Sequence, residues 1–257
     1  MTVWLVERLR DGVMWPLNLL RDGGVRIGRL AQTVWHGIMG LVWLIPDGWQ
    51  AAREGDFGDW LGKQPGHFLF WLHRLLSQLF DLVGGPEIGQ FFMHLITHTT
   101  PLTAEEQAMM QEVLGAKAMR YGEVRVAEGG LMDWVFAHNG NLAFTTWRTV
   151  NFPRNGRHTR ANRAILVHEV AHVYQYEKVG SCYLGEAIYM LIKTKRDCYV
   201  YGGVEGLSRD WAVGKRYRDY NREQQAQIVQ DYFSCCERGQ DVAAYEPFMM
   251  EVRLGNI

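Results

Sequence analysis

The stretch that most constrains this chain is residues 163–176, which read Arg-Ala-Ile-Leu-Val-His-Glu-Val-Ala-His-Val-Tyr-Gln-Tyr. Within them, His168, Glu169 and His172 form an H-E-x-x-H motif. On a helix, residues four apart share a face, so the two imidazoles can bind one zinc ion from the same side. Glu169 lies about 100° further round, where its carboxylate suits a general base acting on water better than a metal ligand.

The residues around the motif are apolar, as expected for a helix buried in a protein core. An alternative is a structural helix whose two His bond to carbonyls and whose Glu pairs with an Arg. We favour the metal site because the motif arises by chance in roughly a few per cent of chains of such composition.

A catalytic zinc site needs a third protein ligand, with water in the fourth position. An H-E-x-x-H-x-x-G-x-x-H pattern is excluded, because Gln175 and Lys178 stand where its Gly and third His would be. We therefore expect a carboxylate farther along the chain. The candidates are Glu186, Glu223 and, more distantly, Asp197.

Glu186 and Glu223 both lie in segments that predict helices, at residues 184–191 and 221–233. Asn221 is a suitable N-cap for the second helix. The polar face of this second helix also carries Gln227, Gln230 and Asp231. These side chains could orient the imidazoles by hydrogen bonds, or they could simply be solvated.

The composition describes a globular chain with no charge bias. Hydrophobic residues make up 47% of 257, and the net charge of −1 gives no indication of a nucleic-acid partner. The four Cys, which include the adjacent Cys235 and Cys236, are interpreted as reduced thiols. No signal peptide or membrane-spanning run is recognisable, so we expect a cytoplasmic protein, with export by a specialised secretion system as an alternative.

Residues 1–98 are expected to form an N-terminal helical region, which holds most of the ten Trp. Gly23-Gly24 and Pro46-Asp47-Gly48 predict breaks, and a helix over residues 68–82 should end at Gly84-Gly85-Pro86. We expect its apolar faces to pack within the protein rather than to contact a membrane interface or a partner, because Lys and Arg do not cluster on the polar faces. His94 and His98 are expected to be ordinary solvent-edge residues rather than a second metal site.

Residues 99–257 are expected to form the catalytic domain. Thr103 and Glu106 predict a capping box, followed by a helix over residues 107–114 that stops at Gly115. Strands are expected at 123–126, 134–136 and 141–147, with a hairpin turn at Asn139-Gly140. This predicts a small, mostly antiparallel sheet. Its 141–150 strand could receive a peptide substrate by strand addition.

Two segments also carry a family resemblance. The run that extends from residues 99–106 through residues 168–175, and the segment 221–232, resemble a bacterial family of zinc metallopeptidases. That family is related to the domain associated with extracellular contractile injection systems and is often labelled Vgr-related. The resemblance covers about residues 99–235. It implies a zincin-like, gluzincin-type domain within an α+β, predominantly helical chain, and it favours Glu223 over Glu186 as the third zinc ligand.

The function expected from these features is hydrolysis of peptide bonds by a zinc endopeptidase acting on a peptide or protein. Zn²⁺ would be held by His168, His172 and Glu223, with Glu169 as general base. Tyr201 and Tyr217 are candidate donors to the oxyanion. The rival hypothesis is a non-catalytic, zinc-containing binding or secretion-effector-associated protein. Glu169 argues against this rival, because a structural zinc site does not need it.

Overall fold

The computed structural model describes the backbone of residues 2–257, and the side chains of residues 16–257 other than residue 131. The side chains of residues 1–8, the segment in which a signal peptide was sought, lie outside the described residues. The chain forms two compact units, residues 12–88 and residues 1–11 together with 89–257. The domain boundary expected near residue 98 stays a prediction.

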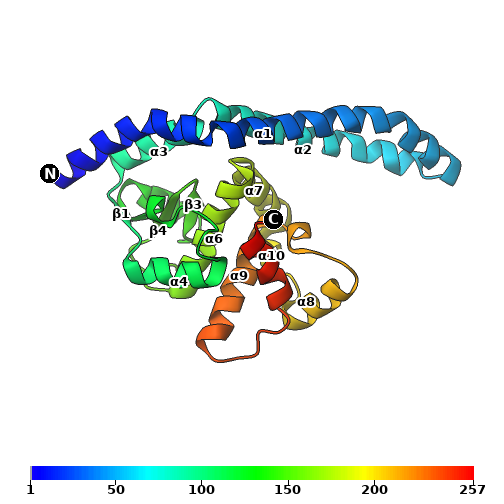
Figure 1. The fold of residues 1–257 in the computed structure, drawn as a ribbon. Helices are drawn as coiled ribbons and strands as arrows, with labels where there is room; N and C mark the ends of the chain where they lie inside the picture. Colours follow the sequence, from blue (N-terminus) through cyan, green and yellow to red (C-terminus); the bar gives the residue numbers. More distant parts are fainter. Residues whose placement is uncertain (1) are drawn as a thin grey trace. The chain divides into compact units, whose positions relative to one another are not determined.

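The unit of residues 12–88 is a helical hairpin (Figure 1). Its helices are α1 (Thr2–Glu54), most of which lies in this unit, and α2 (Phe57–Leu82). The chain reverses at Gly55, whose φ of 85° favours a residue without a side chain. Helix α2 ends just before the Gly-Gly-Pro sequence, as predicted. Gly84 has a φ of 80°, and a further helix, α3 (Gly85–Ile96), begins directly after it.

The breaks expected within the first helix are absent. Gly23-Gly24 and Pro46 lie inside α1, which continues through them. Relative to alanine, glycine lowers helix stability by about 1 kcal/mol and proline by about 3 kcal/mol, but neither forbids the conformation. The long flanking helical stretches therefore carry the chain through these residues.

A four-stranded sheet forms one part of the other unit, in the order β1-β2-β4-β3. The strands are β1 (Thr99–Pro101), β2 (Arg125–Glu128), β3 (Phe144–Thr146) and β4 (Thr149–Phe152). The outer pairs are antiparallel, whereas β2 and β4 run parallel with Val126 opposite Val150. The sheet is thus mixed rather than purely antiparallel, and β3 is one of its edges.

The predicted strand at 134–136 is wrong, because these residues lie in helix α5 (Asp133–His138). Asp133 in the first turn favours a helix, and Trp134 remains 70% exposed. Asn139-Gly140 therefore follows a helix instead of joining two strands. The hairpin turn lies between β3 and β4, where Trp147 adopts a φ of 53°. Its backbone N–H donates to the Tyr183 hydroxyl and its indole to Ser181, contacts that no local sequence signal announces.

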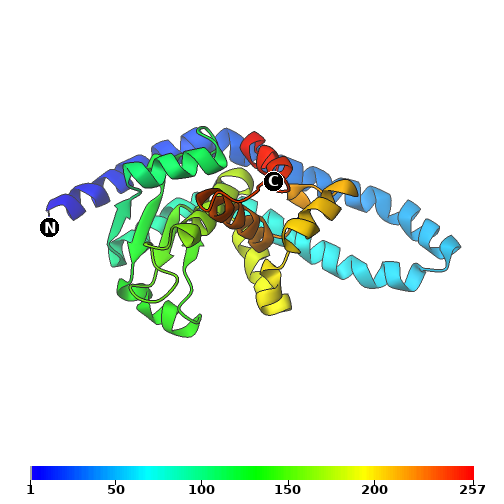
Figure 2. The ribbon, with the colours of Figure 1, turned by 90° about the horizontal axis from the view of Figure 1, so that it is seen from below.

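Helices complete this unit around an apolar core. They are α4 (Ala104–Leu114), α6 (Arg163–Val179), α7 (Cys182–Thr194), α8 (Gly203–Ala212), α9 (Arg222–Glu237) and α10 (Glu246–Leu254), with short 3-10 turns at Tyr121–Glu123, Gly130–Met132, Lys195–Tyr199 and Tyr217–Asp219. Figures 1 and 2 both show α9 alongside α6. Residues 166–176 of α6 are all buried, so this helix runs through the core.

Local signals for three helices agree with the structure. The predicted capping box of α4 forms, since Thr103 Oγ1 accepts from the Glu106 N–H at 3.1 Å and Glu106 accepts from the Thr103 N–H at 2.7 Å. Asn221 caps α9 in the same way, with Gln224 as its partner. Glu186 lies in α7, as expected. The chain is therefore α+β and mainly helical.

Within residues 2–257, no helix is both long and apolar enough to cross a membrane. The four cysteines are free thiols, and Cys182 and Cys198 are buried.

Candidate metal centre

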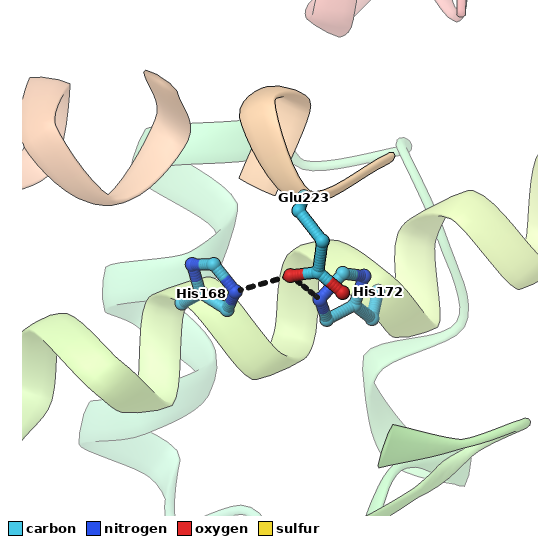
Figure 3. Close-up of side chains that lie close together, drawn as sticks. All are labelled: His168, His172 and Glu223. Carbon is cyan, nitrogen blue, oxygen red and sulfur yellow. Dashed lines mark hydrogen bonds and ion pairs between the residues drawn. The ribbon is translucent and has the colours of Figure 1, made fainter. Parts of the chain in front are cut away.

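Two helices bring three ligand-type side chains to one point. His168 and His172 project from successive turns of α6, and Glu223 projects from the first turn of α9 (Figure 3). Glu223 Oε2 lies 3.4 Å from Nε2 of each imidazole. One donor atom from each residue lies within 4.8 Å of the other two, and all three side chains are buried.

The donor set fits a zinc ion. Two imidazole nitrogens and one carboxylate oxygen form the ligand combination of catalytic zinc sites, and these leave a fourth position for water. Nδ1 of His168 is buried and has no hydrogen-bond partner among the described residues, so the ring's polar contacts lie toward Glu223. Among the described residues, this is the cluster whose geometry could hold a metal.

Charge interactions within the cluster are strong. Burial raises the pKa of the Glu223 carboxyl, but the imidazoles of His172 and His168 outweigh burial and hold that pKa well below its ordinary value. Burial lowers the pKa of His172, but the charge of Glu223 outweighs it and raises the pKa to about 9. Glu223 is therefore ionised at neutral pH, which is the form that binds a cation.

A glutamine positions His172. Gln175 lies one turn further along α6 and is fully buried, and its Oε1 accepts from Nδ1 of His172 at 2.8 Å. This bond leaves Nε2 of His172 facing Glu223. The Gln175 amide in turn donates to the Arg222 carbonyl at 2.8 Å and to Gln225 at 3.2 Å, which ties α6 to the start of α9.

Glu169 lies beside the cluster without joining it. Its side chain is buried, and the Thr145 hydroxyl lies 2.8 Å from its Oε2 and 3.0 Å from its carbonyl oxygen. Thr145 belongs to the edge strand β3, so one hydroxyl connects the sheet edge to the carboxylate. The Thr145 carbonyl accepts from Tyr183 at 3.0 Å, which fixes this part of the strand.

Tyr199 flanks the cluster from the 3-10 turn after α7. Its ring centroid lies 5.9 Å from that of His168, and the side chain is half-buried. Burial and then the charge of Glu223 raise the pKa of its phenol above the ordinary value, so it stays protonated and able to donate. His158, in the loop before α6, is within electrostatic reach of Glu169 and His168, while burial lowers its pKa.

The other residues predicted for the site lie elsewhere. Glu186 forms a 2.7 Å ion pair with Arg222, and Asp197 is exposed. The Tyr201 hydroxyl donates to Asp231 at 2.6 Å, and the Tyr217 hydroxyl donates to the Gln225 carbonyl at 3.0 Å.

Of the two interpretations of the polar face of α9, support of the imidazoles is not seen for Gln227 and Asp231. Gln227 donates to Asp231 at 2.9 Å, so these two residues serve Tyr201 rather than the cluster. Gln175 and Thr145 hydrogen-bond to side chains of the site, and the Tyr199 ring lies against that of His168. Gln175 alone has a sequence signal, as a glutamine in an otherwise apolar stretch one turn after His172.

The second His pair forms no metal cluster within the described part of the chain. His94 is buried, with Nε2 lying 2.9 Å from the Thr149 hydroxyl, so the expectation of a solvent-edge residue is wrong for it. His98 is exposed, as expected.

Comparison with known proteins gives one partial match. No curated protein and no solved structure matches the chain. Residues 101–180, which include the last residue of β1, the other three strands and the H-E-x-x-H helix, match the eCIS core domain. The match links this part of the chain to extracellular contractile injection systems.

Proposed function

We propose that the chain is a zinc-dependent metallopeptidase in which His168, His172 and Glu223 hold the ion and Glu169 is the general base. The observation that carries the proposal is the meeting of two imidazoles and an ionised carboxylate in a buried cluster, with a second carboxylate beside it. The mixed sheet, the H-E-x-x-H helix and the helix that closes on it support a zincin-like arrangement.

A zinc ion in this cluster would act as a Lewis acid that lowers the pKa of its water to about 7 and polarises a carbonyl. Glu169 accepts the proton of the attacking water and passes it to the leaving amine. The Thr145 hydroxyl holds the Glu169 carboxylate in place. The phenol of Tyr199, protonated at neutral pH, donates to the developing oxyanion in place of the Tyr201 and Tyr217 donors expected above.

Strand β3 supports a peptide as the substrate. It is an edge of the sheet, and its Thr145 contacts the general base. A peptide that adds to this edge by backbone hydrogen bonds would pass close to the cluster. The substrate is therefore an extended peptide or protein segment.

Metal content of purified protein tests the site. We expect about one zinc per chain in the wild type and in Glu186→Ala, and loss of zinc in Glu223→Ala, measured by elemental mass spectrometry. Glu186→Ala is the matched control because that carboxylate is paired with Arg222. A wild type that folds but takes up no zinc after reconstitution would refute the proposal.

Turnover tests the general base. Glu169→Gln keeps the size of the side chain but removes the proton acceptor. We expect it to retain zinc and to lose about 10²- to 10⁴-fold in kcat on a peptide library. Full activity of this variant would sink the mechanism.

A non-catalytic, zinc-containing protein of an injection system is the second candidate, and the eCIS core match favours it. In such a protein, Glu169 has no chemical task. The two candidates are separated by the zinc-loaded wild type, because only the peptidase hydrolyses peptides in a manner that Glu169→Gln abolishes.

A further inference from the structure

The hairpin of residues 12–88 buries polar side chains and exposes apolar ones. Its buried side chains include several polar or charged ones, namely Arg26, Thr33, Gln78, Asp81 and Glu87. Large apolar side chains instead lie on its surface, so the expectation that the apolar faces of the N-terminal helices pack within the protein is wrong for them. The most exposed on α1 are Leu20, Leu41, Ile45 and Trp49, between 69% and 80% exposed. A hairpin in water normally shows the opposite arrangement.

The interior of the hairpin is held by charge and by close backbone approach. Arg26 contacts the Glu87 carboxylate and the Asp81 carbonyl, and Arg29 lies 4.0 Å from the Asp81 carboxylate. Nearer the tip, the Trp71 indole donates to the Thr33 carbonyl at 2.9 Å.

Glycines bring the two helices together. Trp71 also packs on Gly37, and Trp60 packs on Gly48, so a side chain at either glycine would collide with an indole ring. Small residues and paired polar groups between helices are typical of helices surrounded by lipid, where apolar packing gives no advantage over apolar surroundings.

The apolar surface goes all the way round the helices. Residues 41–45, Leu-Val-Trp-Leu-Ile, are each between 39% and 80% exposed. Because successive helical residues are about 100° apart, these five cover the whole circumference of α1. Residues 68–70 of α2, Phe-Leu-Phe, are likewise between 50% and 62% exposed. A second copy or a protein partner that docks on one face would leave the other faces in water.

The charge pattern matches an uncharged apolar medium. Residues 30–46 and 64–73 contain no Asp, Glu, Lys or Arg. The charges of the distal half lie at the tip, in residues 47–63, where acids outnumber bases. Trp35, Trp43 and Trp49 are exposed along α1. Tryptophan prefers the boundary between lipid head groups and acyl chains.

We propose that this hairpin binds a lipid bilayer. The uncharged stretches 34–46 and 64–71 are immersed among the acyl chains just below the head groups, where every face is in apolar surroundings, and the charged tip of residues 47–63 lies among the head groups. At about 1.5 Å per residue, the uncharged stretch 30–46 extends about 25 Å, which is less than the ~30 Å hydrocarbon core. The hairpin therefore lies within the interface instead of crossing it. Since basic residues do not cluster on it, binding needs no anionic lipid and resists salt.

Flotation of the full-length chain with phosphatidylcholine vesicles tests the proposal. We expect the wild type to float with the vesicles, equally well at low and at high salt. The double variant Leu41→Asp with Ile45→Asp should bind roughly 100-fold more weakly, because each buried aliphatic side chain contributes about 1.5 kcal/mol or more. The matched control is Ile192→Asp with Val213→Asp, whose side chains are 76% and 77% exposed on the other unit and should not matter.

Circular dichroism must show that the variants stay folded, and solution light scattering reports the oligomeric state. A wild type that fails to float overturns the proposal. If the chain forms a stable oligomer that only the Leu41/Ile45 double variant disrupts, the apolar surface binds a second copy of the chain and the lipid proposal is overturned. Equal loss of flotation in both double variants also contradicts it. The test is independent of the metal centre and can be repeated in chelator.

Discussion

Both units bury charged side chains, but the surroundings of these side chains differ. In residues 89–257, an apolar core surrounds His168, His172 and Glu223, and one ligand-type atom of each lies within 4.8 Å of the other two. In the hairpin, Arg26 pairs with the Glu87 carboxylate and Arg29 lies 4.0 Å from the Asp81 carboxylate, while large apolar side chains face outward. The comparison teaches that a buried charge indicates a ligand only where its surroundings are otherwise apolar and its partners leave a coordination position open.

The largest effect should come from breaking the interior of the hairpin. Arg26→Met leaves Glu87 buried without its partner, which should lower the stability of the hairpin by about 3–5 kcal/mol in urea unfolding. The matched control is Arg163→Met, whose 3.0 Å pair with Glu237 is exposed and should be worth less than about 1 kcal/mol. If the two variants lose the same free energy of unfolding, the buried Arg26–Glu87 pair contributes no more than an exposed one.

Rising pH above 6.5 should lower the stability of the metal-free protein but raise its affinity for zinc. In chelator, the raised pKa of His172 stabilises the fold below about pH 6.5, a contribution lost as pH rises through about 9. The lowered pKa of Glu223 contributes above about pH 4.5 and is lost in acid. The chelated protein should therefore be most stable between these limits.

Zinc requires the neutral imidazole, so its affinity should rise up to about tenfold per pH unit between pH 7 and 9. Thermal unfolding in chelator and zinc competition titrations measure the two trends. In Glu223→Gln, the loss of stability between pH 6.5 and 9 should disappear, because the charge that raises the His172 pKa is gone. If that loss persists, His172 is not its source.

Removing the glutamine behind His172 should have a smaller effect. Gln175→Met keeps the volume but loses the bond to Nδ1, and should weaken zinc binding about 10- to 100-fold in competition with a chelator. Gln227→Met on α9 is the control, since Gln227 bonds to Asp231 instead. Unfolding in chelator separates a general loss of stability from the effect on metal. Unchanged zinc affinity in Gln175→Met would show that His172 needs no support.

The smallest effects are expected from removing the N-cap side chains of α4 and α9, and they should differ between the two helices in zinc binding. Asn221→Ala and Thr103→Ala should each cost about 1 kcal/mol of stability, because each removes an N-cap side chain. Only Asn221→Ala should also weaken zinc binding, since Glu223 lies in the first turn of α9. If both variants bind zinc equally well, the α9 cap does not position Glu223.

Much of the local structure could be predicted from neighbouring residues. The capping box at Thr103, the helix around His168 and the cap at Asn221 depend on contacts three or four positions apart. The predictions failed where distant contacts decide. The predicted strand at 134–136 covers only three residues, which is too short for its period to distinguish a strand from the helix that forms there. The chain turns at Trp147 because Tyr183 and Ser181 accept hydrogen bonds from its backbone and indole N–H groups.

By itself the sequence determined which helix carries the candidate chemistry, because the i, i+4 spacing of His168 and His172 around Glu169 is a local property. Only the tertiary structure decided that Glu223, 55 residues away, reaches the imidazoles while Glu186 pairs with Arg222. It also placed Thr145 on Glu169, and it turned the apolar side chains of the hairpin outward. Such outcomes depend on how helices and strands pack across long sequence separations, which residue order alone does not encode in any local pattern.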